Sequence, residues 1–144
     1  MTHLYIASDH AAYALKEQVK TYLGDTYPGI NIHDLGCHSE ESVHYPEYGK
    51  AVAQKVVGTQ HKGIVLCGSG IGISIAANRV KGARAALCMT AEMASLSREH
   101  NDANILALGA RLIDEQLAYN IIDAFMTTQF AGGRHQMRVD MLDR

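Results

Sequence analysis

The sequence has little of several features that would assign it to a specialised class of protein. It has only three cysteines, none of them in a CxxC pair, and its thirteen basic residues nearly balance its fifteen acidic ones. This even balance excludes the broad positive field of a nucleic-acid-binding domain, so we expect no nucleic-acid partner. Few, unpaired cysteines are typical of free thiols in a reducing compartment.

Long apolar runs are also missing. No run approaches the length of a membrane-spanning helix, and the N-terminal residues lack the charged and apolar regions of a signal peptide. We therefore expect a cytoplasmic protein with no membrane partner. With 144 residues, 47% of them apolar, the chain has the size and composition of a single domain spanning residues 1–144.

Short apolar runs alternate with amphipathic segments along the chain. The runs at residues 4–7, 64–67, 85–88 and 105–108 are nearly continuous, which predicts strands buried on both faces. Residues 30–33 alternate apolar and polar side chains instead, which favours an edge strand. The order of elements predicts a three-layer α/β/α, doubly wound, Rossmann-like domain with a five-stranded parallel sheet. Residues 130–144 form a polar, arginine-containing C-terminal arm.

A glycine-rich segment follows the third predicted strand and leads into a predicted helix. It reads Gly-Ser-Gly-Ile-Gly-Ile-Ser over residues 68–74. Glycines let the backbone approach a ligand, and a helix N-terminus presents free N–H groups to an anion. The GxGxG spacing, its place after the third strand and the absence of a Gly-Lys-Ser/Thr sequence disfavour dinucleotide and Walker-type sites. A tight turn with no ligand is the structural alternative.

Cys67 ends the strand before this loop. A cysteine at a strand end is usually a small apolar core residue. A thiol beside a helix N-terminus and a row of amides is instead favoured as a thiolate, which acts as a base or a nucleophile. From its position alone both interpretations stay open.

Other polar residues follow predicted strands. Asp9 and His10 follow the first strand; Asp9 is suited to cap the first helix, whereas His10 has no obvious structural role. Arg111 follows the fifth strand, and Arg134 and Arg138 share a face if the arm is helical. Together with His10, the three arginines are suited to chelate a phosphate, and the alternative is a solvated basic face.

His100 and Asn101 lie before the fifth strand. In a parallel sheet this places them near the amino ends of the strands, and the C-terminal arm starts from the same edge. We therefore expect these residues to lie away from Cys67 within one subunit. Either they are structural, or a second subunit of a symmetric dimer supplies them.

Histidines and one cysteine crowd the segment 33–44 and raise the question of a zinc site. The residues concerned are His33, Cys37, His38 and His44. Their spacing matches no standard pattern of zinc ligands, so we expect no metal site.

Four segments of the chain together resemble ribose-5-phosphate isomerase type B. They are Ser-Asp-His-Ala at 8–11, Cys-Gly-Ser-Gly-Ile-Gly-Ile-Ser-Ile-Ala-Ala-Asn at 67–78, Ser-Arg-Glu-His-Asn-Asp at 97–102 and Gly-Gly-Arg-His-Gln-Met-Arg-Val at 132–139. The family includes allose-6-phosphate isomerases and the galactose-6-phosphate isomerase subunits. The resemblance implies interconversion of ribose 5-phosphate and ribulose 5-phosphate in pentose phosphate metabolism, without a metal or other cofactor. It also implies a homodimer or a dimer of dimers whose active sites lie at the subunit interface. The C-terminal tail helix of each subunit would cross to the partner there.

The resemblance implies a role for each matching residue. Cys67 would move the proton between C2 and C1 through an enediolate, and Asp9, Ser69 and His100 would assist opening of the sugar ring. The substrate-binding positions are Tyr45 at the sugar, Gly68, Gly70, Gly72, Ser74 and Asn101 at the enediolate, and His10, Arg111, Arg134 and Arg138 at the phosphate. Ile73 stands where some members carry a glutamate, which places the chain in the cysteine branch.

Other functions stay open at this point. The substrate could be a six-carbon sugar phosphate, either allose 6-phosphate or galactose 6-phosphate. A non-catalytic phosphosugar-binding module would keep the glycine loop and the arginines but would not need Cys67, Asp9 and His100 together. A redox sensor based on Cys67 would lack a clear resolving cysteine.

Overall fold

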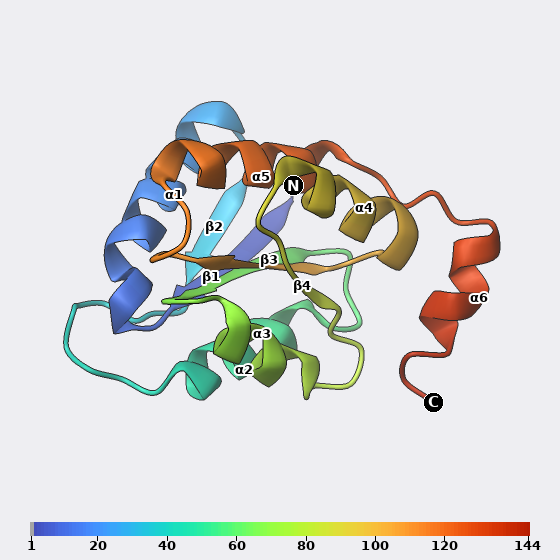
Figure 1. The fold of residues 1–144 in the computed structure, drawn as a ribbon, viewed down its shortest axis with the longest axis horizontal. Helices are drawn as coiled ribbons and strands as arrows, with labels where there is room; N and C mark the ends of the chain where they lie inside the picture. The colour runs from blue at the N-terminus through green and yellow to red at the C-terminus, as the bar shows by residue number, and fades with distance from the viewer. Residues whose placement is uncertain (1) are drawn as a thin grey trace.

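The computed structural model describes residues 2–144 and contains a five-stranded parallel sheet between two layers of helices (Figure 1). The strands are β1 (His3–Ser8), β2 (Asn31–Asp34), β3 (Lys62–Cys67), β4 (Ala85–Leu87) and β5 (Ile105–Gly109), in the order β2-β1-β3-β5-β4. The helices are α1 (Tyr13–Thr26), α2 (Tyr45–Val56), α3 (Ile71–Asn78), α4 (Ala91–Asn101), α5 (Glu115–Thr127) and α6 (Arg134–Asp140), with a 3₁₀ turn at His10–Ala12. The predicted doubly wound α/β fold is confirmed.

None of the helices in this described part of the chain has the length and apolar character that crossing a membrane requires.

Each face of the sheet carries its own apolar core. Helices α1, α4 and α5 cover one face, where Leu66 and Phe125 are fully buried, and α2 and α3 cover the other, where Val65 and Ile73 are (Figure 1). Successive residues of a strand point to opposite faces, so a strand covered on both sides needs apolar residues at every position. This requirement explains the continuous apolar runs of β3 and β5, in which each buried Leu or Ile contributes about 1.5–3 kcal/mol.

The two edge strands differ from the central ones. β2 pairs only with β1, and all four of its residues are partly exposed, which confirms the edge strand predicted near residues 30–33. The expectation of a strand buried on both faces at residues 85–88 is wrong. β4 pairs only with β5, is three residues long and is half-buried throughout, because it forms the other edge of the sheet.

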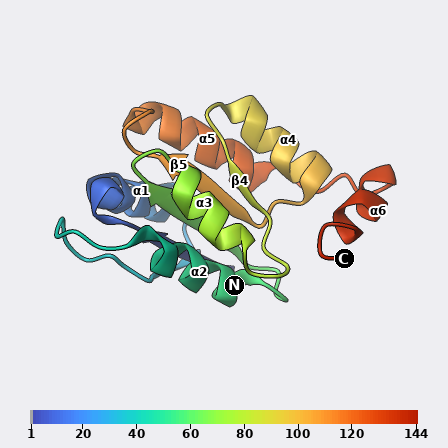
Figure 2. The ribbon, with the colours of Figure 1, turned by 60° about the horizontal axis from the view of Figure 1, so that its bottom comes forward.

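Helix α6 lies apart from the sheet, beside the C-terminal end of α4 (Figures 1 and 2). The ring of His135 stacks on that of His100, with 4.4 Å between centroids, and the Ala131 N–H donates to the Glu99 carbonyl at 3.1 Å. The helical form of the arm is thereby confirmed. Its crossing to a partner chain stays a prediction.

A lysine is among the largest fully buried side chains in residues 2–144. Lys16 of α1 has no exposed surface, and its Nζ is paired with Oδ2 of Asp34 at the end of β2. Lys20 binds the same oxygen at 2.8 Å. Burial alone would raise the pKa of Asp34, but hydrogen bonds from both lysines and from the Gly36 N–H outweigh burial and lower the pKa. Asp34 therefore keeps its charge and balances the buried ammonium.

The same carboxylate holds the turn that follows β2. Oδ1 of Asp34 accepts a hydrogen bond from the Gly36 N–H at 2.8 Å. Gly36 and Cys37 in turn bind the backbone of Ser8, each through a 2.8 Å hydrogen bond. The ion pair thus fixes the turn against the end of β1, directly before Asp9.

We expect Asp34→Asn to lower the free energy of unfolding at pH 7 by about 3–5 kcal/mol, because it leaves the buried Lys16 ammonium with only the more distant and more exposed carboxylate of Glu17, at 3.5 Å. The pKa of Asp34 is lowered in the folded state, so its contribution is present above its ordinary pKa of 3.8 and is lost as pH falls through the lower folded value. Denaturant unfolding of both proteins at pH 7 and at successively more acidic pH measures this difference.

The matched control is Asp25→Asn, which changes an exposed carboxylate at the end of the same helix. We expect little effect there, and we expect Lys16→Met to recover much of the loss in the Asp34→Asn background. Equal losses from Asp34→Asn and Asp25→Asn would show that the buried ion pair is unimportant.

Candidate active site at the carboxyl edge of the sheet

Cys67 lies at the carboxyl end of β3, the central strand, and is 4% exposed. Its Sγ accepts a hydrogen bond from the Gly70 N–H at 3.1 Å. Helix α3 begins one residue later, with the positive end of its dipole at the loop. The sulfur thus faces a backbone N–H donor and the positive end of a helix. The thiol is therefore placed where a reactive cysteine is expected, although it also packs in the apolar core.

The glycine loop rests directly on the end of β5. Gly70 has a φ of +76°, and a Cβ there would lie 2.8 Å from the carbonyl carbon of Leu108. A Cβ on Gly109 would lie 2.5 Å from the carbonyl oxygen of Ser69. Because backbone meets backbone at both points, side chains are excluded. The segment forms a tight turn, and its close packing holds the loop amides beside the thiol.

The first turn of α3 lies at the same carboxyl edge of the sheet. The amides of Gly72 and Ile73 lie in this first turn, where helix geometry provides no intrahelical acceptor. Tyr45, the first residue of α2, lies over Gly72, where an added Cβ would be 2.6 Å from its Cε1 atom. The side chains of Ser69 and Ser74 bind the backbone of Ile71 at 3.1 and 2.8 Å. These contacts bring Tyr45, the loop and the helix N-terminus together.

Asp9 and His10 reach this edge from β1. Asp9 is 8% exposed, its N–H donates to the Leu66 carbonyl at 3.1 Å, and its Oδ1 caps the Ala12 N–H at 3.2 Å. Asp9 thus has a capping role, but it caps the 3₁₀ turn His10–Ala12 that leads into α1 and not α1 itself. The expectation that His10 has no structural role is wrong, because its Nδ1 accepts the Val43 N–H at 3.1 Å. Sequence reasoning missed this contact, because it depends on the path of the loop before α2.

Arg111 follows β5 and lies at the same edge of the sheet. Its N–H donates to the Gly68 carbonyl at 2.9 Å, and its guanidinium lies over Gly68, where an added Cβ would be 3.0 Å from Nη1. The side chain is exposed, and no carboxylate in residues 2–144 forms an ion pair with it. Its charge is therefore available to an anion at this edge.

The other predicted site residues form a second group. His100 and Asn101 end α4, which leads to the amino end of β5, and Arg134 and Arg138 lie on α6. His100, Asn101 and Arg138 line a cavity of 260 Å³ together with His135. The predicted separation of this group from Cys67 within one chain is confirmed by the topology.

His135 belongs to this second group, although sequence reasoning gave it no role. Desolvation, followed by the charges of His100, Arg134 and Arg138, lowers the pKa of His135. The only sign in the sequence that His135 belongs to this group is its place beside Arg134, in an arm that also carries Arg138 and Arg144. That signal did not predict the stacking on His100.

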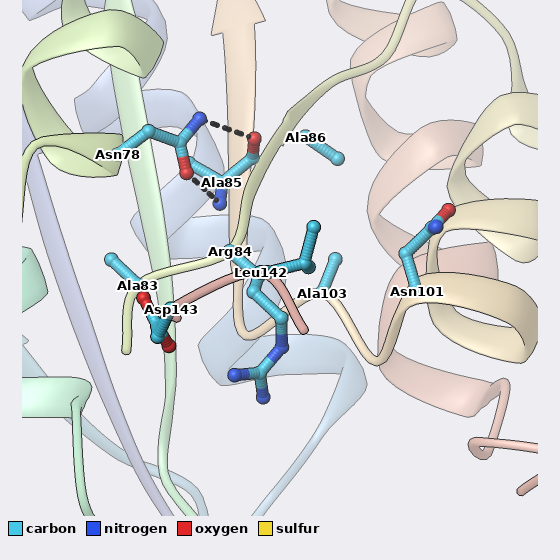
Figure 3. Close-up of a pocket in the computed structure, with 9 residues that line it drawn as sticks. All are labelled: Asn78, Ala83, Arg84, Ala85, Ala86, Asn101, Ala103, Leu142 and Asp143. Atoms are coloured by element: carbon cyan, nitrogen blue, oxygen red, sulfur yellow. Dashed lines mark hydrogen bonds between the residues drawn. The ribbon is translucent and has the colours of Figure 1, made fainter. Parts of the chain in front are cut away.

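A larger cavity of 440 Å³ is separate from the thiol (Figure 3). It is lined by the ends of α3 and α4, the segment that enters β4 and the C-terminal residues. The Asn78 side chain bonds the Ala85 carbonyl and N–H at 2.9 and 2.8 Å, so it has a structural role there. Only Asn101 among the predicted site residues contributes to this cavity, and we do not regard it as the active site.

Two of the four residues considered for a zinc site, His33 and Cys37, have other partners. His33 Nε2 lies 2.8 Å from Nδ1 of His3, and Cys37 Sγ donates to the Ser39 carbonyl at 3.3 Å. Within residues 2–144, no three His, Cys, Asp or Glu side chains are arranged to hold a metal ion.

The fold and this edge define an α/β domain that places a thiol and a glycine loop after β3, a carboxylate after β1 and an arginine after β5, at the carboxyl ends of three neighbouring strands. The model of one family, described as ribose/galactose isomerase, matches residues 4–142. The chain belongs to this family of isomerases.

Relatives with known names are similar to this chain along nearly its full length. Ribose-5-phosphate isomerase B of Escherichia coli is 41% identical over 143 residues, which cover 99% of this chain and 95% of the relative. The crystal structure of a ribose 5-phosphate isomerase from Thermotoga maritima matches with a TM-score of 0.94 and 52% identity, covering 99% and 97% of the two chains. A ribose-5-phosphate isomerase B from Mycoplasma genitalium, solved with bound ribulose 5-phosphate, matches with a TM-score of 0.94 and 37% identity over 99% of this chain and 95% of that one.

The contact between loop and sheet gives a stability prediction. Gly70→Ala should lower the free energy of unfolding by about 3 kcal/mol, because alanine is strained at positive φ and its Cβ meets the β5 backbone. Gly24→Ala is the matched control, since its Cβ would enter open space within α1 and should stabilise the protein by about 0.5–1 kcal/mol. Denaturant unfolding compares the two, and a neutral Gly70→Ala would refute the tight packing.

Proposed function

We propose that this isomerase interconverts ribose 5-phosphate and ribulose 5-phosphate, with Cys67 as the group that transfers the proton. The observation that carries the proposal is the hydrogen bond from the Gly70 N–H to the Cys67 sulfur, at the start of α3. It provides a base beside a row of amides, the combination that proton abstraction next to a carbonyl requires.

The reaction follows from these positions. The Cys67 thiolate removes the proton from C2 of the open-chain aldose, and the electron pair of that C–H bond forms a double bond between C1 and C2. The carbonyl oxygen O1 gains negative charge, which the first-turn amides of Gly72 and Ile73 stabilise. The O2 hydroxyl proton then passes to O1, which becomes the C1 hydroxyl. The thiol returns its proton to C1 and is a thiolate again, while O2 becomes the ketone oxygen.

Groups around the thiol would hold and open the sugar. Asp9 follows β1 and Ser69 lies in the loop after β3, and both would assist ring opening together with His100. Tyr45 would line the sugar site, because its ring covers the first turn of α3. Holding the substrate through a remote phosphate fixes C1 and C2 relative to the base.

The phosphate would bind to cations from both groups of residues. His10 and Arg111 lie at the carboxyl edge, whereas Arg134 and Arg138 lie on α6. Guanidinium groups match phosphate oxygens in charge and geometry. All four side chains can bind one phosphate only if the two groups of residues meet at a single site.

A homodimer, alone or paired into a tetramer, would bring the two groups together. Exposed apolar side chains lie on both surfaces that would meet: Ile71 and Ile75 on α3 are 51% and 48% exposed, and Met137 on α6 is 73% exposed. A second copy that covers them would place His100, Asn101 and the α6 arginines of one chain beside Cys67 of the other. The three free cysteines fit a reducing compartment, and we place the enzyme in the cytoplasm.

Cys67→Ala is expected to reduce turnover of ribose 5-phosphate by about 10²–10⁴-fold, because the reaction loses its base. Cys88→Ala should keep turnover, since burial raises the pKa of Cys88 to about 11 and leaves it a neutral thiol at pH 7. Ketose formation by metal-free protein measures both variants. Retained turnover in Cys67→Ala would assign the base to another group.

The same assay separates the competing functions. Rapid turnover of ribose 5-phosphate by the intact protein supports the proposal. Turnover only of allose 6-phosphate or galactose 6-phosphate would change the substrate but keep the proton transfer. Binding of a sugar phosphate without turnover of any of the three would indicate a non-catalytic binding module.

Complementation between two inactive variants tests the shared site. If Cys67 and His100 of one site come from different chains, a dimer of Cys67→Ala with His100→Ala contains one intact site. Equal amounts of the two proteins, mixed, unfolded and refolded together, should recover about a quarter of the wild-type activity, because half of the dimers are mixed and half of their sites are intact. Refolding each variant alone is the control. No recovery above the separate variants would place both residues in one chain.

A further inference from the structure

Basic residues surround a small cavity at the amino edge of the sheet, on the side opposite Cys67. Its volume is 260 Å³, and its charged lining consists of Lys62, Arg84, Arg98 and Asp102. Lys62 is the first residue of β3, whereas Cys67 is the last, so the full length of the strand separates the cavity from the candidate active site.

The charges around this cavity do not balance. Asp102 is the only carboxylate in the lining and serves both arginines, with 3.0 Å from Oδ1 to Arg98 Nη1 and 3.4 Å from Oδ2 to Arg84 Nη2. Three cationic side chains minus one carboxylate leave two uncompensated positive charges. Such an excess in a partly enclosed space attracts an anion.

The two arginines are held in place by backbone carbonyls. Arg98 is 8% exposed and donates to the carbonyls of Thr128 at 3.1 Å and Ala103 at 2.6 Å. Arg84 donates through Nε to the Asp102 carbonyl at 2.8 Å. Because these bonds fix the guanidinium groups, the cations cannot separate to relieve their repulsion.

Lys62 is the free donor of the cluster. Within residues 2–144, its ammonium forms no hydrogen bond or ion pair with another side chain. Burial and the nearby charge of Arg98 lower its pKa, and Asp102 opposes this only in part. A second anion beside Lys62 would remove this electrostatic cost.

We propose that this cavity, bounded by Lys62, Arg84 and Arg98, binds a phosphate group, as inorganic phosphate or as part of a small phosphomonoester. A phosphomonoester carries about −1.5 to −2 charge at pH 7, which matches the two uncompensated positive charges. The Lys62 ammonium donates to its oxygens, and the fixed guanidinium groups supply the surrounding field. The site does not depend on the proposed isomerase reaction.

Pyridoxal 5′-phosphate is a suitable probe because it carries a phosphate and an aldehyde. A neutral lysine amine adds to the aldehyde carbon and loses water, and borohydride reduces the imine to a stable amine that mass spectrometry locates. We expect Lys62 to be labelled several-fold faster than Lys55, an exposed lysine on α2. Pyridoxal, which lacks the phosphate, should label Lys62 several-fold more slowly than pyridoxal 5′-phosphate does.

Competition identifies the source of the phosphate. Inorganic phosphate and ribose 5-phosphate should each slow labelling of Lys62 but not of Lys55, and the stronger competitor indicates the natural ligand. Arg84→Gln should weaken both labelling and protection. In folded wild-type protein, equal labelling of Lys62 by pyridoxal and pyridoxal 5′-phosphate, or no protection by either competitor, would overturn the proposal. The readout is a mass and not turnover, so this result is independent of the isomerase assay.

Discussion

The contact between the glycine loop and the carboxyl end of β5 determines where the chemistry of this protein can occur. Gly70 and Gly109 allow the backbone of the loop to lie against the backbone of the strand, so the loop has almost no freedom to move. Cys67 ends β3 directly before the loop, and α3 begins four residues later, at Ile71. The sulfur, the loop amides and the helix N-terminus are therefore held in one rigid arrangement. The residues from β1, α2 and β5 are placed around it.

The buried ion pair between Lys16 and Asp34 has a related effect at the neighbouring strand. It lies in the layer of α1, yet its hydrogen bonds pass through Gly36 to the backbone of Ser8, which precedes Asp9. A charge pair far from the thiol thus helps to position the end of β1. The two features differ in their physical basis. The contact between the loop and β5 excludes side chains by close packing, whereas the ion pair depends on charges that burial would otherwise disfavour.

Most of the fold could be predicted from local patterns, because strands buried on both faces must be apolar at each position and the glycine loop marks the central strand. The edge position of β4 could not be predicted, because a short apolar run does not show how many strands pair with it. Lys16 reads as a solvent-facing helical residue until Asp34 is placed beside it. Likewise, the contact of His10 with Val43 and the stack of His135 on His100 join segments distant in sequence. The candidate site was thus predictable in its residue types and its edge of the sheet, but not in these contacts.

The loose attachment of α6 has a consequence for the lifetime of the protein. The helix packs beside α4 and follows two glycines with positive φ, and much of its surface is exposed. Such a segment opens by local unfolding at a lower free energy than the sheet, so a single chain has a resistant core and a labile end. Proteases cut preferentially at labile ends. Burial of α6 against another molecule would remove this weakness, and the rate at which the chain is degraded would then depend on its concentration.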